Sequence, residues 1–312
     1  MKLAPKARYY TLGPEVARAI QQGLPIVALE STVITHGLPR PQNLELARQM
    51  ETEVRAQAAI PATIALLDQK VHVGLTETEL ERLANEPAAR KVSRRDFGAA
   101  LAQGAVGGTT VAGTLIAAHM VGIKVFATGG IGGVHRDAPF DISADLPELA
   151  RTPVIVVCAG AKAILDLPAT LEYLETAGVP VIGYGTRDFP AFYSRCSGLS
   201  VPITAQTPAE IAEIARAHWA VGLQSALLVV QPPPEADALP AEIVEAAIEK
   251  ALAEAKAQNI HGAATTPFLL SRVSTLTEGA SLKSNLALLR NNARLAGQIA
   301  REMATPRRQQ EA

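Results

Sequence analysis

The sequence has few of the residues that mark several classes of protein. Aromatic residues make up only 4% of its 312 residues, with one Trp, which argues against a protein that binds single-stranded nucleic acid by stacking bases. The formal net charge is −1, from 29 Lys and Arg against 30 Asp and Glu, so no overall basic field recruits nucleic acid. Any recognition of phosphate must therefore be local.

Cysteine and long apolar runs are also scarce. The two cysteines, Cys158 and Cys196, are too few for a disulfide framework, and Cys158 lies inside an apolar run, where a buried reduced thiol is expected. No uninterrupted apolar run reaches the roughly 18 to 20 residues that cross a bilayer. The first residues lack the apolar core of a signal peptide. We therefore expect a cytoplasmic protein without membrane association.

The rest of the composition indicates a globular chain with a large core, at 48% hydrophobic and 19% charged residues. Strand-like apolar runs alternate with amphipathic helical segments, which is typical of a mainly parallel sheet covered by helices. We predict a three-layer α/β/α sandwich with a mainly parallel, mixed central sheet. A single catalytic domain is expected over residues 1–304, followed by a disordered polar tail at 305–312. The predicted strands are 26–29, 63–67, 70–73, 123–127, 154–157, 179–182 and 226–230, and the predicted helices are 43–57, 76–85, 113–121, 163–177, 208–221, 241–258 and 281–303.

Local signals refine two of these elements. Asp68-Gln69 between two of the strands predicts a hairpin. Thr76 with Glu79 three residues later predicts a capping box, and Asn43 is a candidate N-cap of the helix that it begins.

A lysine stands at the end of the most apolar run, in residues 153–166. The run is too continuous for a half-exposed strand, and it stops at Gly160 before Lys162. Because open α/β sheets bind ligands beyond the carboxyl ends of their strands, Lys162 is a candidate nucleophile that could attack a carbonyl carbon. The alternative is a solvated lysine in the first turn of the next helix.

Two further strand exits carry polar groups. Glu30 ends an apolar strand, where a carboxyl could be held protonated for general acid work. A capping or ion-paired glutamate is the alternative. Lys91 and Ser93 belong to a short basic cluster, 91–96, which could bind a phosphate through a charge and a hydroxyl or could simply be solvated.

Two glycine-rich stretches suggest close approach of the backbone to a ligand. Residues 104–114 run into a helix, whose first amides could bind an anion. The stretch is not a Walker loop, because no Gly-Lys-Ser/Thr ends it, and it lacks the dinucleotide-binding spacing. In the second stretch four glycines follow Thr128, and the loop continues to His135, which could contact phosphate or be solvated.

Two aspartates and a group of asparagines are further candidate ligand-binding residues. Asp141 and Asp145 are four residues apart, so on a helix they would share a face. Their hard oxygens suit Mg²⁺ or Mn²⁺ better than Zn²⁺, although two capping aspartates explain the spacing equally well. In 281–292 three Asn residues interrupt a helical pattern, and an Asn side chain matches the edge of an amide-like base. Helix packing or a polar surface is the alternative.

Together these segments resemble the pseudouridine-5′-phosphate glycosidases, also called the indigoidine synthase A-like family. The matching motifs follow the family order over nearly the whole chain, from about Pro25 to Ile299. They are Ala28-Leu-Glu-Ser-Thr-Val-Ile-Thr-His-Gly-Leu-Pro39, Pro41-Gln-Asn43, Thr128-Gly-Gly-Ile-Gly-Gly-Val-His135, Phe140-Asp-Ile-Ser-Ala-Asp-Leu146, Val157-Cys-Ala-Gly-Ala-Lys162 and Ser281-Leu-x-x-Asn285.

The resemblance implies an activity, a metal and an assembly. It implies reversible cleavage of pseudouridine 5′-phosphate to uracil and ribose 5-phosphate by a homotrimer with Mn²⁺. Lys162 would be the nucleophile, Glu30 the proton donor, and Asp141 would hold the ion largely through waters. The implied substrate contacts are Lys91, Val111 through its backbone, Ser143, Ala144 and Asp145, with Asn285 facing uracil and Thr128 and His135 near the phosphate.

The chemistry agrees with that implication. The leaving carbon of a C-glycoside has no lone pair to protonate, so the two carboxylates of ordinary glycosidases do not suffice, whereas a lysine Schiff base does. Three rival readings remain. An aldolase-like lyase would not need Asn285, and a ribosidase could act on another modified base. A sugar-phosphate-binding module without activity predicts the loss of Glu30 or Lys162, and both are present.

Overall fold

A mostly parallel sheet forms the middle layer of the computed structural model, which describes residues 8–136, 138–260, 262 and 265–305. Its strand order is β1-β4-β3-β2-β7-β10-β14-β12-β13, and every pair along this path is parallel except β3 with β4. The strands are β1 (Tyr10–Leu12), β2 (Ile26–Leu29), β3 (Ile60–Leu67), β4 (Lys70–Val73), β7 (Val125–Ala127), β10 (Ile155–Cys158), β12 (Val181–Tyr184), β13 (Ile203–Ala205) and β14 (Leu227–Val230).

Two short strands extend one side of this sheet. β6 (Gly107–Thr109) pairs antiparallel with β3, and β5 (Arg90–Val92) pairs in parallel with β6. A separate small sheet has the order β11-β8-β9, from β8 (Val134–His135), β9 (Ala138–Ile142) and β11 (Leu165–Asp166).

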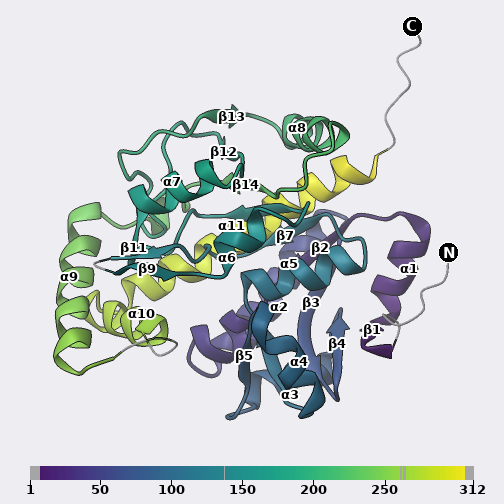
Figure 1. Ribbon diagram of the computed structural model, residues 1–312, viewed down its shortest axis with the longest axis horizontal. Coiled ribbons are helices and arrows are strands. Elements are labelled where there is room, and N and C mark those ends of the chain that lie inside the picture. The colour runs from purple at the N-terminus through teal and green to yellow at the C-terminus, as the bar shows by residue number, and fades with distance from the viewer. Residues whose placement is uncertain (1–7, 137, 261, 263–264, 306–312) are drawn as a thin grey trace, which may run out of the picture.

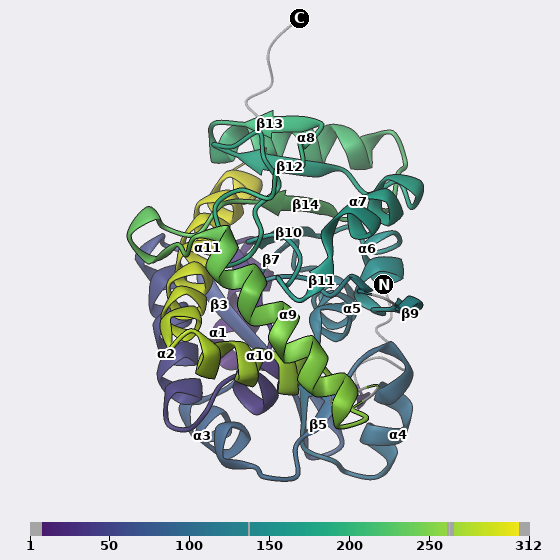
Figure 2. The same cartoon turned by 90° about the vertical axis from the view of Figure 1, so that its left-hand side faces the viewer.

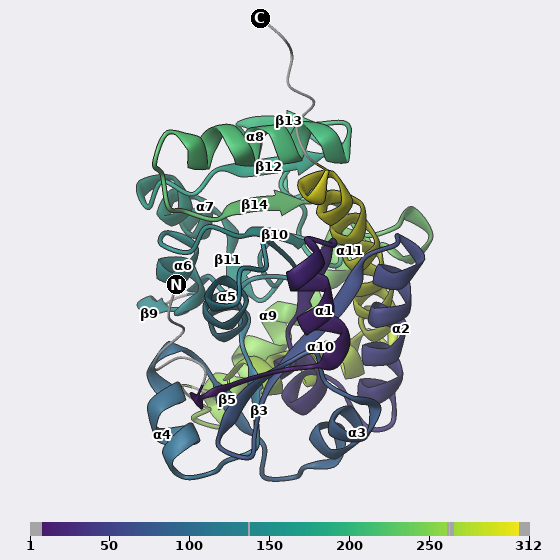
Figure 3. The same ribbon diagram turned by 90° about the vertical axis from the view of Figure 1, so that its right-hand side faces the viewer.

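Helices cover both faces of the large sheet, as the edge-on views show (Figures 2 and 3). The helices α2 (Gln42–Ala56) and α11 (Ala280–Ala304) lie on one face, and α5 (Val111–Met120), α6 (Asp145–Leu149) and α7 (Leu167–Thr176) lie on the other. All residues of β2, β10 and β14 are buried, because both of their faces pack against helices. The predicted three-layer α/β/α fold with a mixed sheet is confirmed.

The remaining helices surround this sandwich (Figure 1). They are α1 (Pro14–Gln22), α3 (Glu77–Asn85), α4 (Phe97–Ala102), α8 (Pro208–Ala220), α9 (Ala241–Ala257) and α10 (Thr265–Leu276). None of the helices in the described residues is long and apolar enough to span a bilayer. Apart from Thr305, the predicted disordered tail lies outside the described residues.

Of three local signals in the first part of the chain, two are confirmed, whereas β1, α1, β5, α4 and β6 were not predicted. The hairpin β3–β4 forms through Asp68 and Gln69, both with positive φ, and Thr76 and Glu79 form the capping box. The predicted N-cap at Asn43 is wrong, since Pro41 holds that position. The Asn43 amide is buried and donates to two carbonyl oxygens, of Ile34 (2.9 Å) and Ala84 (3.0 Å). Because buried carbonyl groups require hydrogen-bond donors, the Asn43 amide satisfies these two carbonyl oxygens and does not cap the helix.

Candidate active site

Three neighbouring strands bring the candidate chemistry together. Glu30 follows β2, Thr128 follows β7, and Lys162 follows β10 after a short turn. These strands lie side by side and are parallel, so their carboxyl ends meet at one edge of the sheet. The strand-exit hypothesis for Glu30 and Lys162 therefore places both groups at the same edge.

A cavity of about 900 Å³ lies at this edge. Among the described residues, its wall contains Glu30 and Lys162 together, so the two groups do not face separate cavities. Most of the other candidates also line it, namely Lys91, Val111, His135, Asp141, Ser143, Ala144, Asp145 and Asn285. Thr128 is the exception, because it is fully buried behind the wall.

Lys162 is presented by backbone structure and not by a helix. Gly160 adopts a φ of 87°, and the Lys162 amide donates to the carbonyl of Ile131 (3.1 Å). The helix α7 begins only at Leu167, where the Asp166 side chain caps it, so the alternative of a lysine in the first helical turn is wrong. Within the described residues no hydrogen bond or ion pair engages the half-buried Lys162 amine. The amine is thus available to a ligand.

Glu30 is nearly enclosed, with 9% of its surface exposed, and the Thr128 hydroxyl donates to its carboxyl group. Burial is the main cause that raises the pKa of Glu30 above its ordinary value. The charge of Lys162 and the Thr128 hydrogen bond oppose this rise, but they do not cancel it. No ion pair to Glu30 lies within 4 Å in the described part of the chain. A carboxyl group in this setting can hold a proton and donate it.

Lys91 brings a second cation to the cavity. It comes from β5, where Val92 points into the core and Lys91 to the other side. Although Lys91 is exposed by surface area, the concave wall partly desolvates its amine, which lowers the pKa of Lys91, and the charge of Lys162 lowers it further. Nearby Ser93 places a hydroxyl on the wall of the same cavity. These groups suit an anionic ligand.

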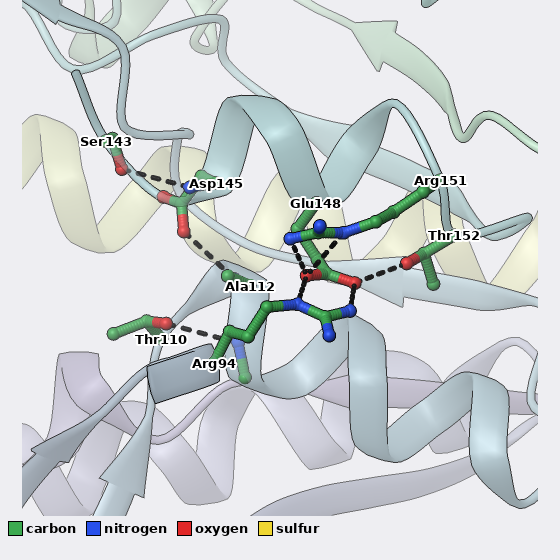
Figure 4. Close-up of polar contacts among 9 residues, drawn as sticks. Arg94, Thr110, Ala112, Ser143, Asp145, Glu148, Arg151 and Thr152 are labelled. Carbon is green, nitrogen blue, oxygen red and sulfur yellow. Dashed lines mark hydrogen bonds and ion pairs between the residues drawn. The ribbon is translucent and has the colours of Figure 1, made fainter. Parts of the chain in front are cut away.

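Asp145 connects two walls of the cavity. Its carboxylate accepts from the backbone amide of Gly132 (2.8 Å). It also accepts from the backbone amide of Ala112 (2.9 Å) (Figure 4). A side chain at Gly132 would collide with Ser143, since a Cβ there would lie 2.1 Å from the Ser143 hydroxyl oxygen. The expected anion site at the start of α5 is thus partly filled by the protein's own carboxylate, while Val111 lines the cavity.

Asp141 and Asp145 do not share a helix face, contrary to the sequence prediction. Asp141 lies on β9, whereas Asp145 begins α6, because the chain turns at Ser143 and Ala144 between them. Asp141 is exposed and makes no hydrogen bond or ion pair within the described part of the chain, and its charge acts on His135. Burial lowers the pKa of His135 despite this neighbour.

This donor set allows a divalent ion with only one protein ligand. No group of three or more His, Cys, Asp or Glu side chains among the described residues could hold a metal. The free carboxylate of Asp141 is a hard oxygen donor that suits Mn²⁺ or Mg²⁺, provided that water or substrate supplies the other ligands. Such a fit agrees with an ion held largely through waters.

The asparagines of α11 divide between the cavity and the core. Asn285 lines the cavity, and its side chain makes no hydrogen bond within the described residues. Asn292 is buried, and its amide donates to the Thr128 carbonyl (2.8 Å) while it accepts from Gln231 (2.9 Å). Asn285 is therefore free for a ligand, whereas Asn292 ties α11 to the glycine-rich loop.

Sequence reasoning missed several residues of the wall. Arg94, from the basic cluster 91–96, lines the cavity, but its ion pair with the buried Glu148 was missed, because the sequence offers no signal for it. Phe192 packs against Gly130 from a backbone with a φ of 62°. The helix α10 adds Thr266, Pro267 and Leu270 to the wall, although no helix was predicted there.

Sequence comparison places the chain among known proteins. Residues 15–302 match the family described as indigoidine synthase A-like protein. The chain belongs to the indigoidine synthase A-like family. It is 57% identical over 299 residues to the pseudouridine-5′-phosphate glycosidase of Paracoccus denitrificans (strain Pd 1222), covering 94% of this chain and 98% of that one. It is 54% identical over 291 residues to the Solibacter usitatus (strain Ellin6076) protein of the same name, covering 93% and 97%.

Solved structures of similar proteins have the same fold. The prealnumycin C-glycosynthase AlnA, in complex with ribulose 5-phosphate, superposes with a TM-score of 0.88 at 41% identity and covers 95% of this chain and 97% of that chain. An indigoidine synthase A-like protein from Thermotoga maritima gives the same TM-score at 36% identity, with the same coverage.

Proposed function

We propose that this protein cleaves the C-glycosidic bond of pseudouridine 5′-phosphate, reversibly, to uracil and ribose 5-phosphate. The observation that carries the proposal is the shared cavity of Glu30 and Lys162 at the exits of β2 and β10. A carboxyl group with a raised pKa and an unpaired amine in one cavity suit proton donation combined with nucleophilic attack. The relatives named pseudouridine-5′-phosphate glycosidase support the choice of substrate.

In the proposed reaction the ribose ring opens before the carbon–carbon bond breaks. Glu30 donates a proton to the ring oxygen as its bond to C1′ breaks, and the uncharged Lys162 amine forms a bond to C1′. The ammonium nitrogen formed in this way returns a proton to the Glu30 carboxylate. Its lone pair then forms the C1′=N bond of a protonated imine as the C1′–C5 bond breaks, and the C1′–C5 electron pair passes to C5 of uracil, which takes up a proton. Water hydrolyses the imine, which releases ribose 5-phosphate and regenerates the amine.

The other cavity residues bind and orient the substrate in this scheme. The cavity wall offers charged groups and backbone amides to the phosphate-bearing sugar. They come from Lys91, His135, the start of α5 at Val111, Ser143, Ala144 and Asp145. The free amide of Asn285 is suited to the donor and acceptor edge of uracil. We assign Thr128 the task of holding Glu30, since its hydroxyl donates to that carboxyl group and not into the cavity.

A divalent ion, Mn²⁺ in our proposal, would be held by Asp141 and waters. When bound, the ion supplies positive charge to an anionic substrate. We also propose that the protein acts in pseudouridine catabolism, in the cytoplasm and as a homotrimer, as the family resemblance implies. The mass of the native protein in sedimentation analysis tests the trimer.

The direct test is release of uracil. Purified protein with Mn²⁺ and pseudouridine 5′-phosphate should release uracil and ribose 5-phosphate, and EDTA should suppress the reaction. An aldolase-like lyase would form a lysine adduct with a sugar phosphate but release no uracil. If no uracil is released at every Mn²⁺ concentration tested, the proposed substrate is wrong.

Borohydride trapping tests the nucleophile. With ribose 5-phosphate and borohydride, mass spectrometry should find a stable addition on the peptide that contains Lys162, and Lys162→Ala should lose both the addition and activity. Lys124→Ala is the matched control, because Lys124 lies over the Trp219 ring (5.3 Å to its centroid), outside the cavity wall. Turnover of Lys162→Ala at the wild-type rate would refute the scheme.

A further inference from the structure

We propose that Glu148 and Arg94 are positioning residues that hold Lys91 in the cavity wall. The inference rests on the proposed function in one respect, since it takes Lys91 as a substrate contact. Neither Glu148 nor Arg94 belongs to the residues that the reaction scheme uses.

Glu148 has an unusual environment for a carboxylate, because its side chain is fully buried. Its oxygens accept from the Arg94 guanidinium at two points (2.5 and 2.8 Å) and from the Thr152 hydroxyl (2.6 Å), and Arg151 adds further bonds (3.0 and 3.2 Å) (Figure 4). Burial by itself raises the pKa of Glu148, but the hydrogen bonds from Arg94, Thr152 and Arg151 outweigh it and leave the pKa below the ordinary value. Glu148 is therefore a charged and fully bonded anchor at neutral pH.

Arg94 connects this anchor to the segment that carries Lys91. It follows the three-residue strand β5, which pairs only with β6 among the described strands, at the side of the main sheet path. On the side of α5, the Thr110 amide donates to the Val92 carbonyl (2.9 Å). The Arg94–Glu148 pair, 54 residues apart in sequence, attaches the same segment to α6. Because β5 is three residues long and is paired along one edge only, by β6, we infer that this bidentate pair holds its other end in place and with it Lys91.

The helix α6 is well placed for this task, because it has only five residues and carries two buried acids, Asp145 and Glu148. Asp145 at its start binds the amide of Gly132. It also binds the amide of Ala112, and Glu148 one turn later binds Arg94 (Figure 4). Three parts of the cavity wall are therefore bonded to α6, namely the β5 segment, the start of α5 and the glycine-rich loop.

If Glu148 had a purely structural role, the loss of its bond to Arg94 and the loss of its bonds to Arg151 would affect activity equally. Arg151 and Thr152 lie three and four residues after Glu148, so their bonds are local to the end of α6. Among the bonds to Glu148 in the described part of the chain, only those from Arg94 reach another wall of the cavity. Arg151→Ala is therefore a matched control that removes hydrogen bonds from the same carboxylate without releasing the β5 segment.

The experiment is a double-mutant cycle on kcat/KM for uracil release from pseudouridine 5′-phosphate. Arg94→Ala and Glu148→Gln should each lower kcat/KM about tenfold or more, and Arg151→Ala should stay within about twofold of the wild type. In a Lys91→Ala background, Arg94→Ala should cost less than about twofold, because the residue it positions is gone. Arg94 lines the cavity, so a loss in Arg94→Ala by itself does not separate positioning from direct substrate contact. Glu148 lies outside the cavity wall, so a loss in Glu148→Gln reports positioning alone.

Either of two results overturns the inference: equal losses in Arg94→Ala and Arg151→Ala, or an undiminished Arg94→Ala loss in the Lys91→Ala background. Amide hydrogen exchange of residues 90–96 provides a readout that needs no activity. Exchange should rise in Arg94→Ala and not in Arg151→Ala, and equal exchange in the two variants would also overturn the inference. A wild type that releases no uracil would refute the proposed function alone, and the exchange measurement would still decide the role of Arg94.

Discussion

The substitution Asp145→Asn tests whether one buried carboxylate holds two walls of the cavity. Asp145 is 6% exposed, and its two oxygens accept from the amides of Ala112 and Gly132. Asparagine has nearly the same shape but offers one acceptor and an NH₂ donor. One of the two backbone N–H groups would then face a donor instead of an acceptor.

The size of the effect follows from those two bonds. A hydrogen bond to a charged group contributes about 1.5–3 kcal/mol, and an unpaired buried N–H costs about 1–3 kcal/mol. Because these two effects describe the same lost bond and overlap, we expect the free energy of unfolding to fall by about 3 kcal/mol. Relaxation is limited, since Ser143 packs tightly against Gly132.

Urea denaturation of Asp145→Asn and of Asp141→Asn as its control measures this effect. Asp141 is exposed and forms no hydrogen bond in the described part of the chain, so its substitution should change the free energy of unfolding by less than about 0.5 kcal/mol. Asp145→Asn should also lower kcat/KM at least about tenfold, because Val111 and Gly132 both line the cavity. A stability of Asp145→Asn equal to that of Asp141→Asn would refute the reasoning.

Three further predictions concern single groups. Burial raises the pKa of Glu30, so a reaction that needs its proton slows as pH rises through that raised value. Glu30→Gln should lower kcat about 100-fold or more and abolish this fall of the rate at alkaline pH. If the fall persists in the variant, another group causes it. Asn285→Ala should raise the KM for uracil in the reverse reaction about tenfold and leave the KM for ribose 5-phosphate unchanged; equal changes in both constants would contradict a role at the base. Burial raises the pKa of the Cys158 thiol to about 12. At pH 8 a thiol reagent should therefore modify one cysteine, the exposed Cys196, in the native protein and two cysteines after unfolding. Rapid modification of both cysteines in the native protein would contradict the burial of Cys158.

Prediction from sequence succeeded where the determinants are local. The hairpin at Asp68 and Gln69 and the capping box at Thr76 depend on residues within a few positions of each other, and both are present. Asn43 failed as a cap because its real partners, Ile34 and Ala84, are distant in sequence and their need for a donor could not be read from the chain. For the same reason the start of α7 was predicted too early, at residue 163, since Leu165 and Asp166 form the strand β11 and pair with β8 before the helix begins.

The chain by itself determined that Glu30 and Lys162 each follow a buried strand, because continuous apolar runs and the glycine after one of them are properties of sequence. That they face one cavity was decided only by the tertiary structure, through the strand order β2-β7-β10. Strand order depends on how crossover helices pack, which no local pattern records. The burial that raises the pKa of Glu30 and the pairing of Arg94 with Glu148 across 54 residues are likewise consequences of long-range packing.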